Sequence, residues 1–185
     1  MISIMSDTIG KLFDDGALAT CARDAFLFRQ GDPVRFMYLV VEGQIDLERH
    51  ARSGTPMTLQ RASVGRVVAE ASAYSATYHC DGIAAEESRA RAIPVTEFRR
   101  RLDRDSHLAG VWAAGLAHAL QAARTNAEIR SLRTVAERLD TWLADGHSLP
   151  PRGRLQSLAQ IFGVTREALY RELSKRDEQG RRLPG

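Results

Sequence analysis

Charged and polar side chains recur at the period of an α-helix near the end of the sequence. They are Arg166, Glu167, Tyr170, Arg171, Ser174 and Lys175. On the same helix the apolar residues Ala168, Leu169 and Leu173 fall on the opposite arc. One face can therefore pack on a protein core while the other presents guanidinium, ammonium and hydroxyl groups to solvent. Such a face is suited to bind a polar, anionic partner.

A second short helix, directly before this one, is expected to hold it in place. Leu155, Leu158, Ala159 and Phe162 follow the spacing i, i+3, i+4, i+7 of an apolar helical stripe. Gly163 allows a tight turn between the two helices, and the small side chain of Ala159 allows them to cross closely. Two helices joined in this way predict a DNA-binding helix-turn-helix.

The distribution of charge agrees with this hypothesis. Residues 152–185 carry eight basic and four acidic side chains, a net charge of +4, so the rest of the chain contributes −1 to the overall +3. A basic segment on a near-neutral body is what attraction to phosphate requires. A solvated helix face would explain the charge alone equally well, and the helix-turn-helix pattern favours the first interpretation.

A second group of reactive side chains is the run Tyr78, His79, Cys80 and Asp81. Imidazole and thiolate together suit copper, zinc or a haem iron, which makes His79 and Cys80 candidate metal ligands. Neighbours on a strand point to opposite faces, so both could bind one ion only at a bulge or loop. Three alternatives stay open: a redox pair with Cys21, a small anionic ligand, or burial of Cys80 as a small apolar residue.

The surrounding pattern indicates an α+β protein. Short β-type runs separated by turn residues extend from residue 25 to 93 and predict a small antiparallel roll or sandwich. Residues 1–20 are expected to form a helical lead-in with an apolar face. After Pro94 every segment is expected to be helical. A half-buried strand over residues 44–49 should alternate between core and solvent, with Asp46 on the solvent side.

The long helix expected from Asp105 or Ser106 towards Arg130 carries a heptad-type seam. Its members are Leu108, Trp112, Gly115, Ala119, Ala122, Asn126 and Ile129. This seam predicts a symmetric dimer, and packing of the same face on the chain's own β domain is the alternative. A hinge is expected at Arg130 or Ser131. The predicted domains are a β-roll sensor (1–104), a dimerisation helix (105–130) and a helix-turn-helix domain (131–185).

Several classes of protein are disfavoured by the sequence. The glycine-rich phosphate loop, metalloprotease histidine pair and nucleophile elbow of common enzymes are absent, so the chain is not expected to be an enzyme. It also lacks an apolar run long enough for a membrane span and a secretion signal, which predicts a cytoplasmic protein. Two cysteines do not form a disulfide framework.

The order of these segments resembles that of the CRP/FNR family of bacterial transcription regulators, over roughly residues 26–175. The most specific parts are Gly31 and Gly43 within FRQGDPVRFMYLVVEGQI, and the run GVTREALYR from Gly163 to Arg171. The resemblance implies a jelly roll like a cyclic nucleotide-binding domain. It also implies a homodimer that binds double-stranded DNA, with RNA polymerase as a further partner.

The family's Arg-Glu-x-x-x-Arg pattern contacts half-sites of TGTGA type. Carried over by position, Arg166 and Arg171 would contact guanines and Glu167 the amino group of a cytosine. These assignments fit the acceptors and donors of the bases. Thr165 stands where a helix N-cap belongs and could also contact phosphate.

The β-roll departs from the family's cyclic AMP pattern, in which a Gly-Glu pair is followed about ten residues later by Arg and Ser or Thr. Here Ala69-Glu70 is followed by His79-Cys80-Asp81. Without the arginine, and with a carboxylate near the expected phosphate, cyclic AMP is not expected to bind. The expected effector pocket comprises Glu70 and residues 78–81, with an unknown ligand, a metal ion or haem among the candidates.

The family's β-hairpin wing is expected to be missing or reduced, because the polar DEQGRRLPG follows the second helix. Phosphate contacts are then expected from five arginines, namely Arg152, Arg154, Arg176, Arg181 and Arg182. The alternative function is a metal- or haem-sensing β-roll protein whose DNA-binding domain is vestigial.

Overall fold

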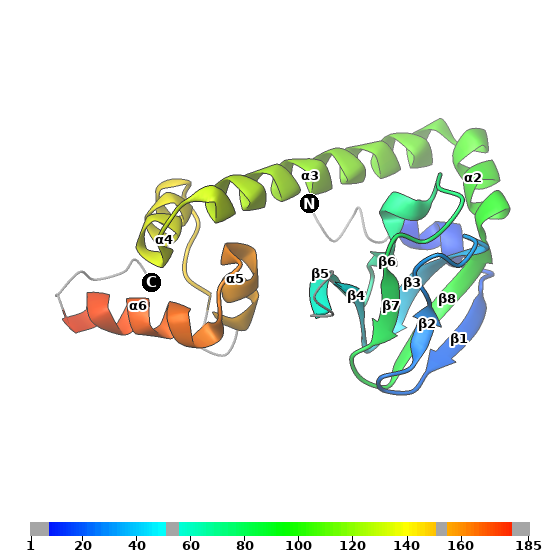
Figure 1. Cartoon of the computed structure of the whole chain (residues 1–185). Helices are drawn as coiled ribbons and strands as arrows, with labels where there is room; N and C mark the ends of the chain where they lie inside the picture. The colour runs from blue at the N-terminus through cyan, green and yellow to red at the C-terminus, as the bar shows by residue number, and fades with distance from the viewer. Residues whose placement is uncertain (1–7, 51–55, 151–154, 179–185) are drawn as a thin grey trace. The chain divides into compact units, whose positions relative to one another are not determined.

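The computed structural model describes residues 8–50, 56–150 and 155–178. The chain divides into two compact units, one reaching to Leu116 and the other beginning at Ala117. The elements of both are labelled in Figure 1. Each unit has its own apolar core, and the long helix α3 (Ser106–Ser131) contributes side chains to both cores.

The first unit is a roll of two four-stranded antiparallel sheets, with strand orders β1-β8-β3-β6 and β2-β7-β4-β5. The strands are β1 (Ala17–Cys21), β2 (Phe26–Phe28), β3 (Phe36–Glu42), β4 (Gln44–His50), β5 (Pro56–Ser63), β6 (Val67–Val68), β7 (Asp81–Ala84) and β8 (Ser88–Pro94). Val40 in one sheet and Ile45 in the other are both 1% exposed and belong to the same core cluster. The two sheets therefore enclose one core.

Gly43 allows the chain to pass from β3 in one sheet to β4 in the other. Its φ is +74°, and an added Cβ would lie 2.5 Å from the Glu87 carbonyl oxygen and even closer to Ser88 Oγ. Only glycine fits this corner, since any side chain would displace backbone. The same Ser88 Oγ accepts a hydrogen bond from the Gln44 backbone N–H at 3.0 Å. Gly31 also has a positive φ of +88°, but an added Cβ there would meet nothing within 4 Å.

The start of the chain only partly agrees with the predicted helical lead-in. A short 3₁₀ turn, η1 (Lys11–Phe13), buries Leu12 and Phe13 as expected. The helical prediction is wrong for β1, which pairs with β8 from Ala17 opposite Ala92 to Cys21 opposite Ser88. The sequence ALATC has good helix formers, but pairing with a strand some 70 residues away in the chain overrides this weak local preference.

The expectation that Asp46 faces solvent is also wrong. This residue on β4 is only 8% exposed. Its Oδ1 accepts a hydrogen bond from Gln44 Nε2 at 2.7 Å, and its Oδ2 lies 3.3 Å from Nε of Arg61, its cross-strand partner on β5. A buried carboxylate is tolerated here because it is both paired and hydrogen-bonded.

Helix α2 (Val95–Arg104) and the first turns of α3 pack on the roll. The rings of Phe98 and Trp112 meet edge to face with their centroids 5.0 Å apart. Leu108 packs on the same core, so the first turns of the predicted seam face the chain's own β-roll, as the alternative interpretation held. Farther along α3, Ala119 and Ala122 are exposed.

The second unit contains the end of α3 with α4 (Val135–Ala144), α5 (Leu155–Phe162) and α6 (Arg166–Glu178). Helix α4 begins with a capping box, in which Thr134 Oγ1 accepts from the Glu137 N–H at 3.1 Å and Glu137 Oε2 accepts from the Thr134 N–H at 2.9 Å. Ile129 of α3 and Leu139 of α4 are buried in the core that α5 and α6 share.

The predicted α+β class, with an antiparallel β-roll followed by helices, is confirmed. None of the helices in the described ranges is long and apolar enough to cross a membrane. The prediction about the wing concerns residues 179–185, and four of the five predicted phosphate-binding arginines also lie outside the described residues.

Candidate nucleic-acid interface and effector region

Helix α5 supports α6 through the apolar stripe that its sequence predicts. Leu155, Leu158, Ala159 and Phe162 are between 0% and 4% exposed. The helix ends at Phe162 and is followed by Gly163, whose φ is +64°, with the Val164 N–H donating to the Ala159 carbonyl at 3.0 Å. This left-handed glycine ends α5 and redirects the chain into α6.

Helix α6 begins immediately after this turn. Thr165 Oγ1 accepts a hydrogen bond from the Ala168 N–H at 3.2 Å, so the residue is an N-cap as predicted. Leu169 is fully buried and Leu173 packs on the same core. The apolar arc is thus directed inward.

The opposite side of α6 presents the residues predicted to contact DNA. Arg166, Glu167, Arg171 and Lys175 are all exposed, as is the capping Thr165. They form one continuous polar surface along the helix, held by a packed apolar face. The structure therefore brings together the whole predicted set, including Tyr170, which is half-buried at the border of the two faces.

Glu167 is held in its ionised form. Hydrogen bonds to its carboxylate from its own backbone N–H, and then from the Thr165 side chain, lower the pKa of this carboxyl, with a smaller contribution from the charge of Arg166. An ionised carboxylate only accepts hydrogen bonds, so the group is prepared to accept from a base amino group.

Arg176 does not belong to the exposed surface, and the prediction that it contacts phosphate is wrong. It is 4% exposed. Its Nε donates to Glu172 Oε1 at 2.7 Å, its Nη1 to Asp140 Oδ1 at 2.6 Å and its Nη2 to the Ala136 carbonyl at 3.0 Å. The guanidinium fastens α6 to α4, because each of its three nitrogens donates a hydrogen bond within the protein and two of these bonds reach α4.

Two further arginines, whose contacts were not predicted from the sequence, bond to the end of α5. Arg130 of α3 donates to the carbonyls of Ile161 and Gln160 at 3.0 and 2.8 Å. Arg138 of α4 donates to the Phe162 carbonyl at 2.6 Å. These carbonyls lack partners within their own helix, since they belong to its last turn.

Arg138 also braces the connection between α3 and α4, where the hinge is predicted. Its Nη2 donates to the Leu132 carbonyl at 2.7 Å and to the Arg130 carbonyl at 3.0 Å. The ends of α3 and α5 are therefore bonded to one side chain of α4. Whether the connection acts as a hinge stays a prediction.

The predicted effector residues lie around η2 (Glu70–Ser72) and the start of β7. Ala69 has a φ of +55°, a left-handed conformation that a glycine adopts without strain, at the position where family members that bind cyclic AMP have glycine. Glu70 Oε2 accepts a hydrogen bond from Gln60 Nε2 at 3.4 Å. Asp81 Oδ1 accepts from the Gln30 N–H at 2.8 Å.

Tyr78 fills space in the roll. It is 3% exposed, and its ring lies 3.9 Å from that of Phe28 in a stacked arrangement. Its hydroxyl donates to the Phe36 carbonyl at 2.5 Å. Burial, chiefly, raises the pKa of the phenol well above its usual value.

The structure does not bring the candidate metal ligands together. His79 is exposed, with Nδ1 3.1 Å from Ser72 Oγ, whereas Cys80 is fully buried. Burial raises the pKa of the Cys80 thiol to about 11, and burial also raises that of Cys21. Within the described ranges, no cluster of three or more histidine, cysteine or carboxylate side chains could hold a metal ion.

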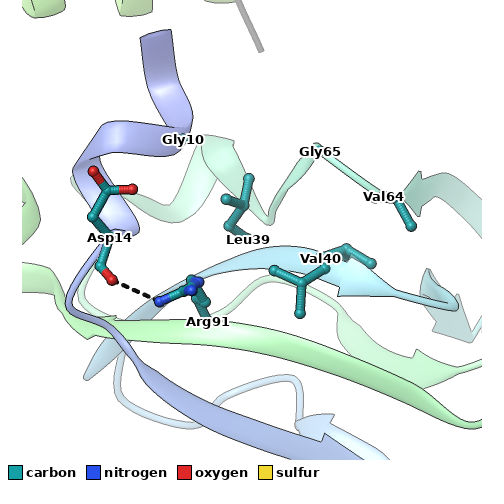
Figure 2. A pocket seen from close by; sticks show the side chains of 8 residues that line it. Gly10, Asp14, Leu39, Val40, Val64, Gly65 and Arg91 are labelled. Atoms are coloured by element: carbon teal, nitrogen blue, oxygen red, sulfur yellow. Dashed lines mark hydrogen bonds between the residues drawn. The ribbon is translucent and has the colours of Figure 1, made fainter. Parts of the chain in front are cut away.

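A shallow groove of about 370 Å³ on the β-roll was not predicted from the sequence (Figure 2). Its lining residues are Gly10, Asp14, Leu39, Val40, Val41, Val64, Gly65 and Arg91. Arg91 Nη1 donates to the Asp14 carbonyl at 2.6 Å, as the dashed line in Figure 2 marks. None of the predicted effector residues lines this groove.

Comparison with known proteins gives a family match in the first part of the chain and solved structures of similar fold. The family model for the cyclic nucleotide-binding domain matches residues 19–105, which span the roll and α2. No curated protein matches the sequence.

Several solved structures of transcription regulators have the same fold. The c-di-GMP responsive global regulator CLP from Xanthomonas campestris shares 19% identity, with a TM-score of 0.65 over 95% of this chain and 93% of its own. FixK2 from Bradyrhizobium japonicum shares 18% identity, with a TM-score of 0.66 over 89% of this chain and 86% of its own.

The catabolite activator protein of Thermus thermophilus shares 23% identity, with a TM-score of 0.57 over 97% of this chain and 87% of its own. The likeness to these structures confirms the CRP/FNR resemblance at the level of the fold.

Proposed function

We propose that this chain is a sequence-specific DNA-binding regulator. Its residues 19–105 belong to the cyclic nucleotide-binding domain family, and its fold is that of the CRP/FNR transcription regulators. It acts as a cytoplasmic homodimer on a TGTGA-like inverted repeat. The observation that carries the proposal is the polar face of α6, which is exposed along its length while the opposite face is buried on α5.

The contacts follow from the chemistry of that face. Arg166 and Arg171 donate to O6 and N7 of guanines, and Glu167 accepts from N4 of a cytosine. Thr165 and Lys175, at opposite ends of the face, contact phosphates and set the register of the helix in the major groove. Arg176 is left out, since its side chain is buried and hydrogen-bonded within the protein.

The dimer forms along the exposed apolar stripe of α3. Ala113, Ala117, Leu120 and Ala127 are exposed and, with Arg124 between the last two, recur in steps of four and three. Leu120 is 53% exposed and is the largest apolar side chain of this stripe. This stripe lies on the side of the helix away from Leu108 and Trp112, which pack on the roll.

The β-roll supplies the sensor, and its ligand is not cyclic AMP. The run His79-Cys80-Asp81 stands where the family has the arginine that pairs with the cyclic phosphate, so a carboxylate is present there and a guanidinium is not. Any effector has to bind two arrangements of the dimer with different affinity. A metal- or haem-sensing protein with a vestigial DNA-binding domain is less well supported, because His79 is exposed and Cys80 buried.

The test is a binding measurement with Arg171→Ala on a duplex carrying the inverted repeat and on a scrambled duplex, at one fixed salt concentration. Loss of a bidentate guanine contact weakens specific binding by about 1–3 kcal/mol and leaves non-specific binding mostly intact. Arg133→Ala is the matched control, because Arg133 is exposed in the same unit but precedes α4. Unchanged affinity of Arg171→Ala for the inverted repeat would rule out the assignment.

A further inference from the structure

Arg166 does not extend freely from α6. Its Cζ lies 5.1 Å from the centroid of the Tyr170 ring, with the guanidinium over the ring face. Its Nη2 also donates to the Tyr170 hydroxyl oxygen at 3.5 Å. The two residues are four apart on one helix, so a single turn brings them together.

The two partners are anchored very differently. Tyr170 is half-buried and packs on the core that α5 and α6 share, whereas Arg166 is exposed. Among the described residues, no carboxylate lies within ion-pairing distance of Arg166. Its neighbour Glu167 accepts hydrogen bonds from its own N–H and from Thr165. The tyrosine ring is thus the fixed support, and the arginine is the side chain that it restrains.

We propose that Tyr170 is a positioning residue that orients Arg166 for guanine. This inference rests on the proposed function. An unrestrained arginine loses rotamer freedom when it binds a base, and prior stacking reduces that loss. Stacking occupies the face of the guanidinium but leaves its edge, which carries the N–H donors, available for the O6 and N7 acceptors of guanine.

The alternative role for Tyr170 is a direct contact between its hydroxyl and a phosphate. The two roles differ in which part of the side chain matters. Positioning requires the ring, so Tyr170→Phe retains most of the positioning effect. Tyr170→Leu loses that effect while keeping an apolar side chain against the core. A phosphate contact requires the hydroxyl, so both variants lose it equally.

The experiment measures binding of the full chain to the inverted-repeat duplex by fluorescence anisotropy at one salt concentration. In separate duplexes, 7-deazaguanine replaces each guanine in turn, which removes only the N7 acceptor. We expect Tyr170→Leu to weaken binding by about two- to fivefold per half-site, the strength of an exposed cation–π pair. The guanine that Arg166 contacts is identified as the one at which 7-deazaguanine no longer weakens binding of Arg166→Ala. In Tyr170→Leu, the loss of affinity caused by 7-deazaguanine should be smaller than in wild type at that guanine alone. Tyr170→Phe and the exposed control Arg133→Ala, which lies before α4 and outside the polar face of α6, should bind within about twofold of wild type.

Two outcomes would overturn the proposal. One is an undiminished effect of Tyr170→Leu in the Arg166→Ala background, which would mean that Tyr170 acts independently of Arg166. The other is a loss in Tyr170→Phe as large as in Tyr170→Leu, which would indicate the phosphate contact.

An NMR measurement on the free protein separates this inference from the proposed function. The Arg166 side-chain protons should be shifted upfield by the tyrosine ring in wild type and in Tyr170→Phe, but not in Tyr170→Leu. Failure of wild type to distinguish the inverted repeat from a scrambled duplex would refute the DNA site itself. Absence of the upfield shift would refute the positioning role whatever the DNA result.

Discussion

Replacing Gly43 with alanine is expected to destabilise the β-roll far more than the same change at Gly31. Both glycines have a positive φ, of +74° and +88°. Both also belong to the segment that carries the family resemblance. They differ in what an added Cβ would meet. Comparing the two alanine variants therefore separates the cost of backbone conformation from the cost of a steric clash.

At Gly31 only the conformational cost applies. A left-handed alanine costs about 1–2 kcal/mol, and the stiffer unfolded chain returns about 0.4–1 kcal/mol of it, so the net loss is about 1 kcal/mol. At Gly43 the new Cβ would also lie 2.5 Å from the Glu87 carbonyl oxygen, and closer still to Ser88 Oγ.

Moving that backbone adds about 1–3 kcal/mol at Gly43. Disturbing the hydrogen bond from the Gln44 N–H to Ser88 Oγ adds about 1 kcal/mol more. Gly43→Ala should therefore cost about 3–5 kcal/mol in all.

The assay is urea unfolding of the full chain in a Trp142→Phe background. Trp142 belongs to the second unit, so the remaining Trp112 reports on the first. Following one unit avoids treating two compact units as a single two-state transition. Free energies of unfolding for Gly31→Ala and Gly43→Ala that agree within about 1 kcal/mol would refute the steric argument.

Three further predictions concern other parts of the chain. Arg176→Gln should lower the free energy of unfolding of the second unit by about 2–4 kcal/mol yet leave the salt dependence of DNA binding unchanged. Lys175→Gln should instead reduce the slope of log binding constant against log salt concentration by about 1 per protomer, without loss of stability. The free energy of unfolding should fall by up to about 2–3 kcal/mol as the pH rises from 9 to 11, because burial raises the pKa of the Cys80 thiol from 9.0 to about 11, and the fall should be smaller in Cys80→Ala. In sedimentation equilibrium, Leu120→Lys should yield monomers while the exposed control Ala122→Lys stays dimeric. The reverse result would place the interface on the heptad seam that includes Ala122.

Apolar periodicity predicted the elements that bury one stripe of side chains. The four apolar residues of α5 are all buried, and the capped start of α6 lies where Thr165 indicates it. Turn chemistry was equally informative at Gly31 and Gly43. These features depend on residues close together in sequence, and that is why a single chain is enough to predict them.

Features set by distant partners were missed. Strand β1 exists because β8 pairs with it, although its local sequence favours a helix. Asp46 is buried because Arg61 lies opposite on the next strand. The face of α3 that the heptad pattern assigned to a second copy is used in its first turns by the roll, since periodicity identifies a buried face but not what covers it.

The arginines of the second unit are a further case in which contacts with distant residues could not be predicted from the sequence. They also change which side chains are expected to contribute to DNA binding. Arg130, Arg138 and Arg176 each donate to a carbonyl or carboxylate of another helix, and the residues around them in the sequence do not distinguish them from Arg166 and Arg171. Counting basic residues therefore overestimates the cations available to phosphate. With fewer non-specific contacts, a larger share of the affinity has to come from the base-contacting end of α6. The orientation of Arg166 by Tyr170 then affects specificity more than it would in a domain with many free cations.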